Sequence, residues 1–486
     1  MTAGVDGPAA AGVDGPAAAG VDGPAPAGEQ PGIGWSDLAG ARVGLWGLRT
    51  EGAANLRRLR ALGVVPVAVD DHPSAPTFGG LPVLRGGDGL AALTRCDVVV
   101  KSPGISRHGE AAQALAHAGV VVAGGLGLWM AEADRDRVVC ITGTKGKSTT
   151  AALAGHLLAG LGHRCLVAGN IGLPPWDPDA GDDWDFWIVE VSSYQATDVA
   201  VAPPVVAVTS LAPDHLDWHR GVEQYYADKL SLCSRPGARL TVADGTSETL
   251  RAHAALLGPT VRWVADGDPE LDGAWVDGLG LPGRHYHRDA LIARACLVGL
   301  GVPGTADDER MARATQGFVP LEHRFRPLGT VAGVRFVDDG LSTNVLPTLA
   351  ALEALGDDPV ALLVGGQDRG IDYTPLADAI ARRAAPLMVA TLPASGARIR
   401  AAVDAALEAA GASAGGPDHP VLDFSALPEA TAAAFEWALP RAGVVLLSPA
   451  APSFGQFRDY RERSAVFEAA MRRCAAAHGV RVEPGG

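Results

Sequence analysis

A recurring order of elements constrains the fold of this chain more than any other feature. Short apolar runs rich in β-branched residues are each followed by a glycine-containing turn and then by a helical pattern, first over residues 42–71 and again over 137–162. Such strand–turn–helix units build parallel sheets that helices cover. We therefore expect an α/β protein, and a chain of 486 residues has room for about three domains.

Changes in composition divide the chain into four parts. Residues 1–39 begin with three copies of AGVDGPA, and we predict a disordered repeat tail there. Residues 40–133 are predicted to form a Rossmann-like domain, and residues 134–319 a central domain with a P-loop ATPase-like parallel sheet. Residues 320–486 are predicted to form a C-terminal Rossmann-like domain, with "VRFVDDG", "VALLVGG" and "VVLLSPA" as buried strands.

The overall charge and the cysteine pattern exclude several classes of protein. A net charge of -15 argues against binding of nucleic acid or of anionic membranes. No stretch approaches the ~20 uncharged apolar residues that span a bilayer, and no export signal is found at the N-terminus. Six cysteines lie far apart without a C-x-x-C pair, which is typical of reduced thiols. We expect a cytoplasmic protein.

The segment "ITGTKGKSTT", residues 141–150, is predicted to bind phosphate. A strand runs into Gly143 and Gly146, and a helix follows, so backbone N–H groups and the helix dipole would face an anion. Lys147 adds a positive charge, and Ser148 can ligate Mg²⁺. The spacing is shorter than G-x-x-x-x-G-K-[ST], because Ile141 stands where that pattern has glycine. A structural glycine turn is the alternative.

Polar residues at the ends of two further apolar strands favour a metal or phosphate site. Glu190 ends the strand in "FWIVEVSSYQ", where an unpaired buried carboxylate would be costly but a magnesium ligand well placed. After the next strand, Asp214, His215, Asp217 and His219 share one short loop. Lys229 follows on a predicted helix, where a lysine is most often a solvated charge.

These motifs occur in the order found in the Mur ligases, and the chain resembles this family over nearly all of residues 40–480. The resemblance is closest to the glutamate-adding type. It rests on the short loop G-T-K-G-K-S-T at 143–149, on Lys229, and on five further segments: G-N-I-G-L-P at 169–174, E-V-S-S-Y-Q at 190–195, D-H-L-D at 214–217, L-E-H-R-F at 321–325 and L-L-S-P-A at 446–450.

The resemblance implies roles for individual residues. ATP would be bound by the phosphate loop and by three residues further on: Gly143, Thr144, Lys145, Gly146, Lys147, Ser148, Thr149, Asp289, Arg324 and Asp339. Two Mg²⁺ ions would be held by Ser148, Glu190, His215 and Lys229, with Lys229 carbamylated, and the catalytic residues would be Lys147, Glu190, His215 and Lys229. The substrates would be bound by Asp70, Ser102, Gly104, Asn170, Ser192, Thr343, Arg369, Ser453 and Tyr460.

The resemblance also implies a reaction. The γ-phosphoryl group of ATP would pass to the terminal carboxylate of UDP-N-acetylmuramoyl-L-alanine, and glutamate would displace phosphate from the acyl phosphate. Closure of the domains would keep water from this intermediate. We expect a monomer that acts in peptidoglycan precursor synthesis.

Departures from the family pattern surround the expected amino-acid site. The usual D-S-K-A-T-N is "DGLSTN" here, so that Leu341 replaces a lysine; Arg369 replaces another, and "GRHYHRD" at 283–289 replaces G-Q-H-N-Y-T-N. Arginine is a planar fork, so it would hold a carboxylate in another orientation. These changes resemble a branch that adds L-glutamate and relies on a separate epimerase, and we favour L-glutamate over D-glutamate. An inactive nucleotide-binding regulator is the alternative of another class.

Overall fold

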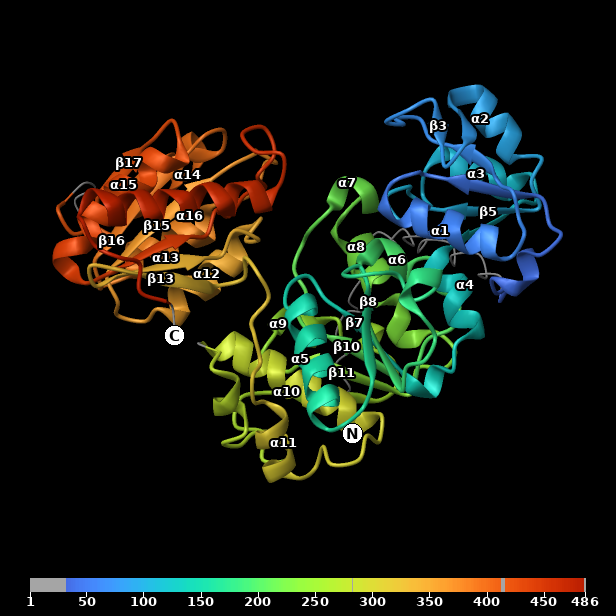
Figure 1. Ribbon diagram of the computed structural model, residues 1–486, viewed down its shortest axis with the longest axis horizontal. Helices are drawn as coiled ribbons and strands as arrows, with labels where there is room; N and C mark the ends of the chain where they lie inside the picture. Colours follow the sequence, from blue (N-terminus) through green and yellow to red (C-terminus); the bar gives the residue numbers. More distant parts are fainter. Residues whose placement is uncertain (1–31, 282, 412–415, 485–486) are drawn as a thin grey trace, which may run out of the picture.

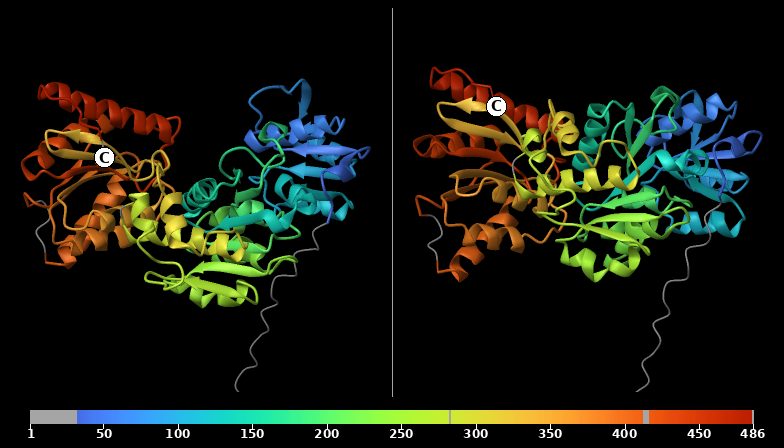
Figure 2. Two further views of the ribbon diagram at one scale, coloured as in Figure 1. Left: turned by 60° about the horizontal axis from the view of Figure 1, so that its bottom comes forward. Right: turned by 90° about the horizontal axis from the view of Figure 1, so that it is seen from below.

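The computed structural model describes residues 32–281, 283–411 and 416–484. Within these ranges three six-stranded sheets follow one another along the chain, each with helices packed on it, which confirms the predicted α/β architecture. The three bodies lie in a row with the central one between the other two (Figures 1 and 2). The AGVDGPA repeats lie outside the described residues.

The first sheet has the strand order β3-β4-β2-β1-β5-β6 and is parallel apart from the β3–β4 pair. Its central strands are buried along their whole length, as expected for a sheet with helices on both faces. Its strands are β1 Val43–Trp46, β2 Val67–Val69, β3 Thr77–Phe78, β4 Leu81–Leu84, β5 Val98–Lys101 and β6 Val121–Gly124, and its helices are α1 Thr50–Ala61, α2 Gly86–Leu93, α3 Glu110–His117 and α4 Gly125–Glu132.

The segment after residue 31 corrects the predicted tail of residues 1–39. Trp35 and Leu38 are fully buried, and the Trp35 indole Nε1 donates to the carbonyl of Gly125 at 3.2 Å. The Trp35 ring lies 6.3 Å from that of Trp176, which belongs to the central part of the chain. Burial of large apolar side chains is favourable enough to hold this segment against the two domains.

The central sheet is entirely parallel, in the order β12-β11-β10-β7-β9-β8. Because β9, β7 and β10 are neighbours, the loops that follow them meet at one edge of the sheet. Its strands are β7 Val138–Thr142, β8 Cys165–Gly169, β9 Phe186–Glu190, β10 Val205–Val208, β11 Leu240–Asp244 and β12 Val261–Val264. Its helices are α5 Lys147–Gly160, α6 Ser193–Ala196, α7 Leu216–His219, α8 Val222–Leu230, α9 Glu248–Ala252, α10 Arg284–Gly299 and α11 Asp308–Ala314.

The third sheet has the order β13-β14-β18-β15-β16-β17, and only the β13–β14 hairpin within it is antiparallel. Its strands are β13 Arg326–Val331, β14 Val334–Asp338, β15 Val360–Gly365, β16 Leu387–Leu392, β17 Val421–Asp423 and β18 Val444–Leu447. Its helices are α12 Val345–Ala354, α13 Thr374–Arg382, α14 Gly396–Ala409, α15 Leu427–Ala438 and α16 Tyr460–Ala477. No helix in the described part of the chain is long and apolar enough to cross a membrane.

The first two sheets are joined more firmly to each other than to the third. One hydrophobic cluster runs from Val43 in β1 to Val206 in β10. A buried ion pair joins Lys101 Nζ to Asp198 at 2.6 Å across the same boundary. The third sheet follows a connecting segment that ends near Phe325, and its packing leaves cavities toward the central sheet. This arrangement places one unit of two domains opposite a C-terminal domain.

Candidate functional site

The glycine loop after β7 has the backbone shape that an anion site needs. Gly143 and Gly146 have φ values of 138° and 87°, a region that glycine adopts without strain. A Cβ at Gly143 would lie 2.2 Å from Thr209 Oγ1, so no larger residue fits there. The chain then enters α5 at Lys147, and the free N–H groups of that helix begin at the loop. These groups and the helix dipole favour a bound phosphate.

Lysine amines converge on this loop from two elements. Lys147 Nζ donates to the carbonyl of Thr144 at 3.2 Å, and Lys145 Nζ lies 3.6 Å from a carboxylate oxygen of Asp214. Burial lowers the pKa of Lys145 to about 8 and also lowers the pKa of Lys147. Amines that are held away from water in this way gain from an incoming anion, because the anion would restore the charged form.

Lys229 is buried, which contradicts the alternative of a solvated charge. Its side chain comes from the last turn of α8, and Nζ donates to the carbonyl of Gly143 at 2.9 Å. Burial and, next, the charge of Lys147 bring the pKa of Lys229 well below its ordinary value. A neutral amine with a free electron pair is the form that reacts as a nucleophile.

The carboxylate of Glu190 is held in place by a hydrogen bond to only one of its two oxygens. Its Oε1 accepts a hydrogen bond from Asn170 Nδ2 at 2.7 Å, while its buried Oε2 has no partner among the described residues. An unpartnered buried carboxylate oxygen beside a phosphate loop suits a hard cation such as Mg²⁺. Among the residues that the structure describes, no cluster of three His, Cys, Asp or Glu could hold a metal ion, so ligands of other kinds would have to complete a metal site.

His215 lies on the loop between β10 and α7, in a left-handed backbone conformation with φ of 52°. Its side chain is 43% exposed, and Nε2 lies 3.8 Å from Asp214. Burial, followed by the nearby Lys145 and Lys229, lowers the pKa of His215 although Asp214 opposes this. The neutral imidazole that results is the form that binds metals.

The C-terminal domain reaches the phosphate loop through Arg324. Its Nη2 donates to Ser148 Oγ at 3.2 Å, and its buried Nε has no partner within the described ranges. A cavity of about 580 Å³ opens there between the two domains. Its lining comprises Thr144, Lys145, Gly146, Lys147, Ser148, Asn170, Ile171, Glu190, Leu321, Glu322, His323, Arg324, Leu341, Thr343, Pro347, Tyr460 and Arg461.

A second cavity, of about 310 Å³, shares Lys145, Gly146 and Arg324 with the first and has more apolar walls. It would take a flat ring beside the phosphates. Its lining comprises Lys145, Gly146, Thr149, Thr209, Ser210, Asp244, His285, Tyr286, Arg288, Asp289, Ile292, Arg324, Phe325, Asp339, Leu346, Pro347, Ala350 and Ala351.

Burial shifts the pKa of two aspartates of this second cavity toward the protonated form. Burial raises the pKa of Asp289 to about 8, and it raises the pKa of Asp339 to about 7 although Ser342 and Ser448 donate hydrogen bonds to that carboxylate. A protonated carboxyl group can donate a hydrogen bond to a ligand, which a carboxylate cannot.

The structure does not bring all predicted residues to these cavities. Asp70 lines a separate cavity of the N-terminal domain, where it accepts hydrogen bonds from the Leu48 and His72 amides, and the Ser102 hydroxyl donates to the Gly47 carbonyl. Ser192 caps α6 in a reciprocal contact with Gln195.

In the C-terminal domain, Thr343 and Tyr460 line the larger cavity, whereas Ser453 and Arg369 do not. Ser453 is buried. Arg369 is exposed on the loop after β15. It follows that only part of the predicted amino-acid site is assembled around the cavity.

Several lining residues were missed by the sequence analysis. Arg461 lies beside Tyr460, and His323 donates to Asp338 at 2.7 Å while its ring packs against that of Tyr460. The ratio of lysine to arginine carries further information about the site. Of 40 Lys and Arg residues only four are lysines, at positions 101, 145, 147 and 229. Where arginine is the default, a retained lysine indicates a position that needs an amine. Nothing comparable distinguishes Arg461 from the other arginines.

Together, the fold and the cavities define a class of nucleotide-binding α/β enzyme whose site lies between two domains. Residues 141–261 match the model of the Mur ligase middle domain. A protein of Micromonospora sp. named UDP-N-acetylmuramoyl-L-alanine--L-glutamate ligase is 38% identical over 465 residues, which cover 90% of this chain and 98% of that protein. Its namesake from Salinispora tropica is 39% identical over 464 residues, covering 90% and 98%. The chain belongs to the Mur ligase family.

Solved structures agree at the level of the fold. UDP-N-acetylmuramate-alanine ligase MurC from Thermotoga maritima superposes with a TM-score of 0.52 at 16% identity, over 90% of this chain and 99% of that one. MurF ligase from the same organism, in complex with ADP, gives 0.52 at 13% identity, over 90% and 95%. At these identities the likeness concerns the fold alone, and it is the two relatives named above that confirm the predicted family.

The raised pKa of Asp289 gives a prediction for stability. In the unfolded chain this group loses its proton near its ordinary value of 3.8, whereas in the folded protein it keeps it to about pH 8. Between these values the unfolded state releases a proton that the folded state retains, so the ionisation of Asp289 lowers stability as the pH rises. Asp289→Asn removes this dependence. Its melting temperature should exceed that of the wild type by a margin that widens from about pH 5 to about pH 8.

Asp357→Asn, at an exposed aspartate before β15, is the matched control for the loss of a carboxyl group. A constant margin for Asp289→Asn would show that Asp289 ionises normally in the folded protein.

Proposed function

We propose that the protein is an ATP-dependent ligase that joins L-glutamate to UDP-N-acetylmuramoyl-L-alanine through an acyl phosphate. One observation carries the proposal: the phosphate loop with Lys147 and the half-satisfied carboxylate of Glu190 share one cavity with residues of a second domain. Such a site can hold a nucleotide, a carboxylate and an amine together. The names of the two relatives described above support the choice of substrates.

The first step transfers the γ-phosphoryl group of ATP to the terminal carboxylate of the UDP-sugar substrate. A carboxylate oxygen attacks the γ-phosphorus, the bond to the β-phosphate oxygen breaks, and ADP leaves. Lys147 and the N–H groups of residues 146–149 would hold the phosphates, because the Thr144 and Lys145 amides donate to Ser210 instead. Arg324 would reach the phosphates from the C-terminal domain. These groups neutralise the charge that spreads over the transferring phosphoryl group.

In the second step the uncharged amine of glutamate attacks the acyl carbon. Inorganic phosphate leaves with its bonding electrons, and the amine nitrogen loses a proton as the amide forms. An acyl phosphate is also open to attack by water, so the C-terminal domain would exclude solvent from the cavity that Arg324 and Tyr460 line.

Mg²⁺ fits the donors at this site. Glu190 Oε2 is buried without a partner, and Ser148 Oγ lies at the helix start that faces the phosphates. We assign one ion to Ser148 and Glu190 and a second to His215 and a carbamylated Lys229. When bound, these ions would neutralise phosphate charge. Asp289 and Asp339 would meet the nucleotide from the second cavity.

The UDP-sugar would extend from this cavity to the N-terminal domain. Asp70 lines a cavity there, and Ser102 and Gly104 begin the loop after β5. Asn170 and Ser192 would lie along the sugar, near Glu190 and at the start of α6. A product that carries L-glutamate would then need an epimerase if the cell wall holds the D-form.

The choice of glutamate isomer tests the proposal. The rate of ATP conversion to ADP and phosphate should rise with UDP-N-acetylmuramoyl-L-alanine plus L-glutamate. With D-glutamate in place of L-glutamate, the rise should be about tenfold smaller. Loss of the amine at Leu341 and the change to arginine at 369 motivate this expectation. A preference for D-glutamate would favour the ordinary D-glutamate-adding ligase, and no turnover with either isomer would favour an inactive nucleotide-binding regulator.

Carbamylation of Lys229 is accessible to carbon NMR. With ¹³C-bicarbonate, the wild-type protein should show a carbamate carbonyl resonance that disappears in Lys229→Ala, because the low pKa of this amine leaves it free to react with CO₂. The small number of lysines makes the assignment simple. A resonance that persists in Lys229→Ala, or none in the wild type, would argue against the modification.

Arg461 is proposed to bind a carboxylate of the incoming glutamate. Lys145, Lys147 and Arg324 surround the phosphate positions, which leaves Arg461 as a cation of the same cavity that can serve the amino acid. Arg461→Ala should raise the KM for L-glutamate about tenfold, since a hydrogen bond between charged groups contributes ~1.5–3 kcal/mol, with the KM for ATP unchanged.

Arg458→Ala is the matched control, because Arg458 is exposed just before the same helix and pairs with Glu462 at 3.3 Å. Equal effects of both substitutions, or none from Arg461→Ala, would remove Arg461 from the site.

A further inference from the structure

Asp228 lies directly before Lys229 in the last turn of α8, and its side chain accepts three hydrogen bonds. Its Oδ2 accepts from His219 Nδ1 at 2.7 Å and from His108 Nε2 at 2.9 Å, and its Oδ1 accepts from Gln224 at 2.8 Å. Burial alone would raise the pKa of Asp228, but these donors lower it to about 2. The end of α8, and with it the backbone of Lys229, is therefore held by α7 through His219 and by the segment after β5 through His108, while Gln224 adds a contact within α8.

His219 extends this network to the other metal-ligand candidates. It is fully buried, and its Nε2 lies 2.9 Å from the hydroxyl of Ser193. Ser193 follows Glu190 by three residues, and His219 follows His215 by four in the segment that includes α7. A displacement of these hydrogen-bonded side chains would therefore move the backbone near all three candidate ligands, Glu190, His215 and Lys229.

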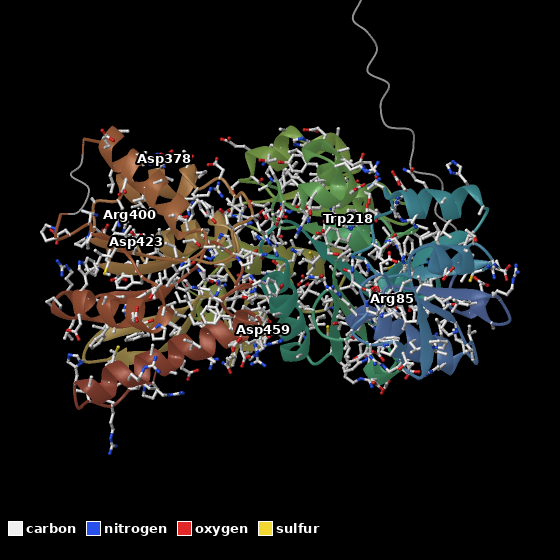
Figure 3. The ribbon with its side chains drawn as sticks, turned by 90° about the horizontal axis from the view of Figure 1, so that it is seen from above. Arg85, Trp218, Asp378, Arg400, Asp423 and Asp459 are labelled. Carbon is white, nitrogen blue, oxygen red and sulfur yellow. The ribbon has the colours of Figure 1, made fainter. Side chains whose placement is uncertain are left out.

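The remaining contacts come from another domain. His108 belongs to residues 102–109 after β5, which we call the β5 loop. Ser106 Oγ in this loop donates to the Trp218 carbonyl at 3.2 Å, and the Trp218 indole donates to the Gly104 carbonyl at 3.1 Å. In Figure 3, Trp218 lies where the central domain meets the N-terminal domain. α7 itself is therefore hydrogen-bonded, through Trp218, to the loop that bears Ser102 and Gly104.

We propose that the contacts of His108 with Asp228 and of Trp218 with Gly104 couple the β5 loop to the metal ligands. A diphosphate bound at the loop would fix the positions of His108 and Gly104, and these would fix α7 and the end of α8. His108 and Trp218 are positioning residues in this scheme, since they act through Lys229 and His215. The inference rests on the proposed function, which places a UDP-sugar at the β5 loop.

Coupling of two sites is reciprocal, so it can be measured without turnover. Mn²⁺ binding to the full-length protein with ADP would be followed by electron paramagnetic resonance, with and without UDP-N-acetylglucosamine, which lacks the carboxylate that undergoes reaction. In the wild type the UDP-sugar should tighten Mn²⁺ binding by about fivefold or more. In His108→Ala, the ratio of the Mn²⁺ dissociation constants measured without and with the UDP-sugar should fall to about one, with either ligand still able to bind alone.

Three further variants separate positioning from a general structural role. His108→Gln keeps a donor for Asp228 and should restore much of the coupling. Trp218→Phe keeps an aromatic ring beside Tyr194 and His219 but loses the indole donor to Gly104, so it should weaken the coupling. This variant keeps the test decisive even if His108→Ala fails to fold. His117→Ala, at the exposed end of α3, should leave it unchanged.

Unchanged coupling in both His108→Ala and Trp218→Phe, or no coupling in the wild type, would overturn the inference. The proposed function is judged separately by turnover with glutamate. A wild-type protein that ligates glutamate but shows no coupling would refute only the role of the network.

Discussion

The arrangement of the central site depends on amines held beside one glycine loop. Lys145, Lys147 and Lys229 approach it from the loop itself, from the start of α5 and from α8, and their pKa values are all lowered by burial. The charged forms of amines brought together out of water would repel one another, so these forms are unfavourable unless anions join them. Glu190 and Asp214 supply part of that negative charge. The phosphates of a nucleotide would supply the rest, so ligand binding and local stability are linked.

Sheet topology explains why these groups meet. The strands β9, β7 and β10 are parallel neighbours, so their C-terminal ends present Glu190, the glycine loop and the 209–219 segment on one edge. The C-terminal domain faces this edge through Arg324, and Asp459, at the start of α16, lies at the end of that domain nearest the central one (Figure 3). The N-terminal domain shares a hydrophobic cluster with the central sheet and so presents the β5 loop at a fixed place.

Much of this architecture could be predicted because it depends on local patterns. Strand ends followed by Gly143 and Gly146 identify a phosphate loop, and an acid that ends an apolar strand, such as Glu190, signals a ligand. What the pattern could not provide depends on contacts between distant segments. Trp35 is buried through its contact with the ring of Trp176, and buried Lys229 donates its hydrogen bond to the Gly143 carbonyl. The role proposed for Arg461 depends on its place in a cavity between two domains. The spacing of residues along the sequence does not predict these long-range contacts.

The claim on which the mechanism turns is that phosphate is transferred to the substrate carboxylate before the amide forms. UDP-N-acetylmuramoyl-L-alanine labelled with ¹⁸O in both oxygens of its terminal carboxylate tests this directly, because the oxygen that attacks ATP leaves with phosphorus. During ligation of L-glutamate, mass spectrometry should find one ¹⁸O in each phosphate released. Phosphate without label, formed at the same rate as the ligated product, would contradict an acyl phosphate and with it the function proposed for this site.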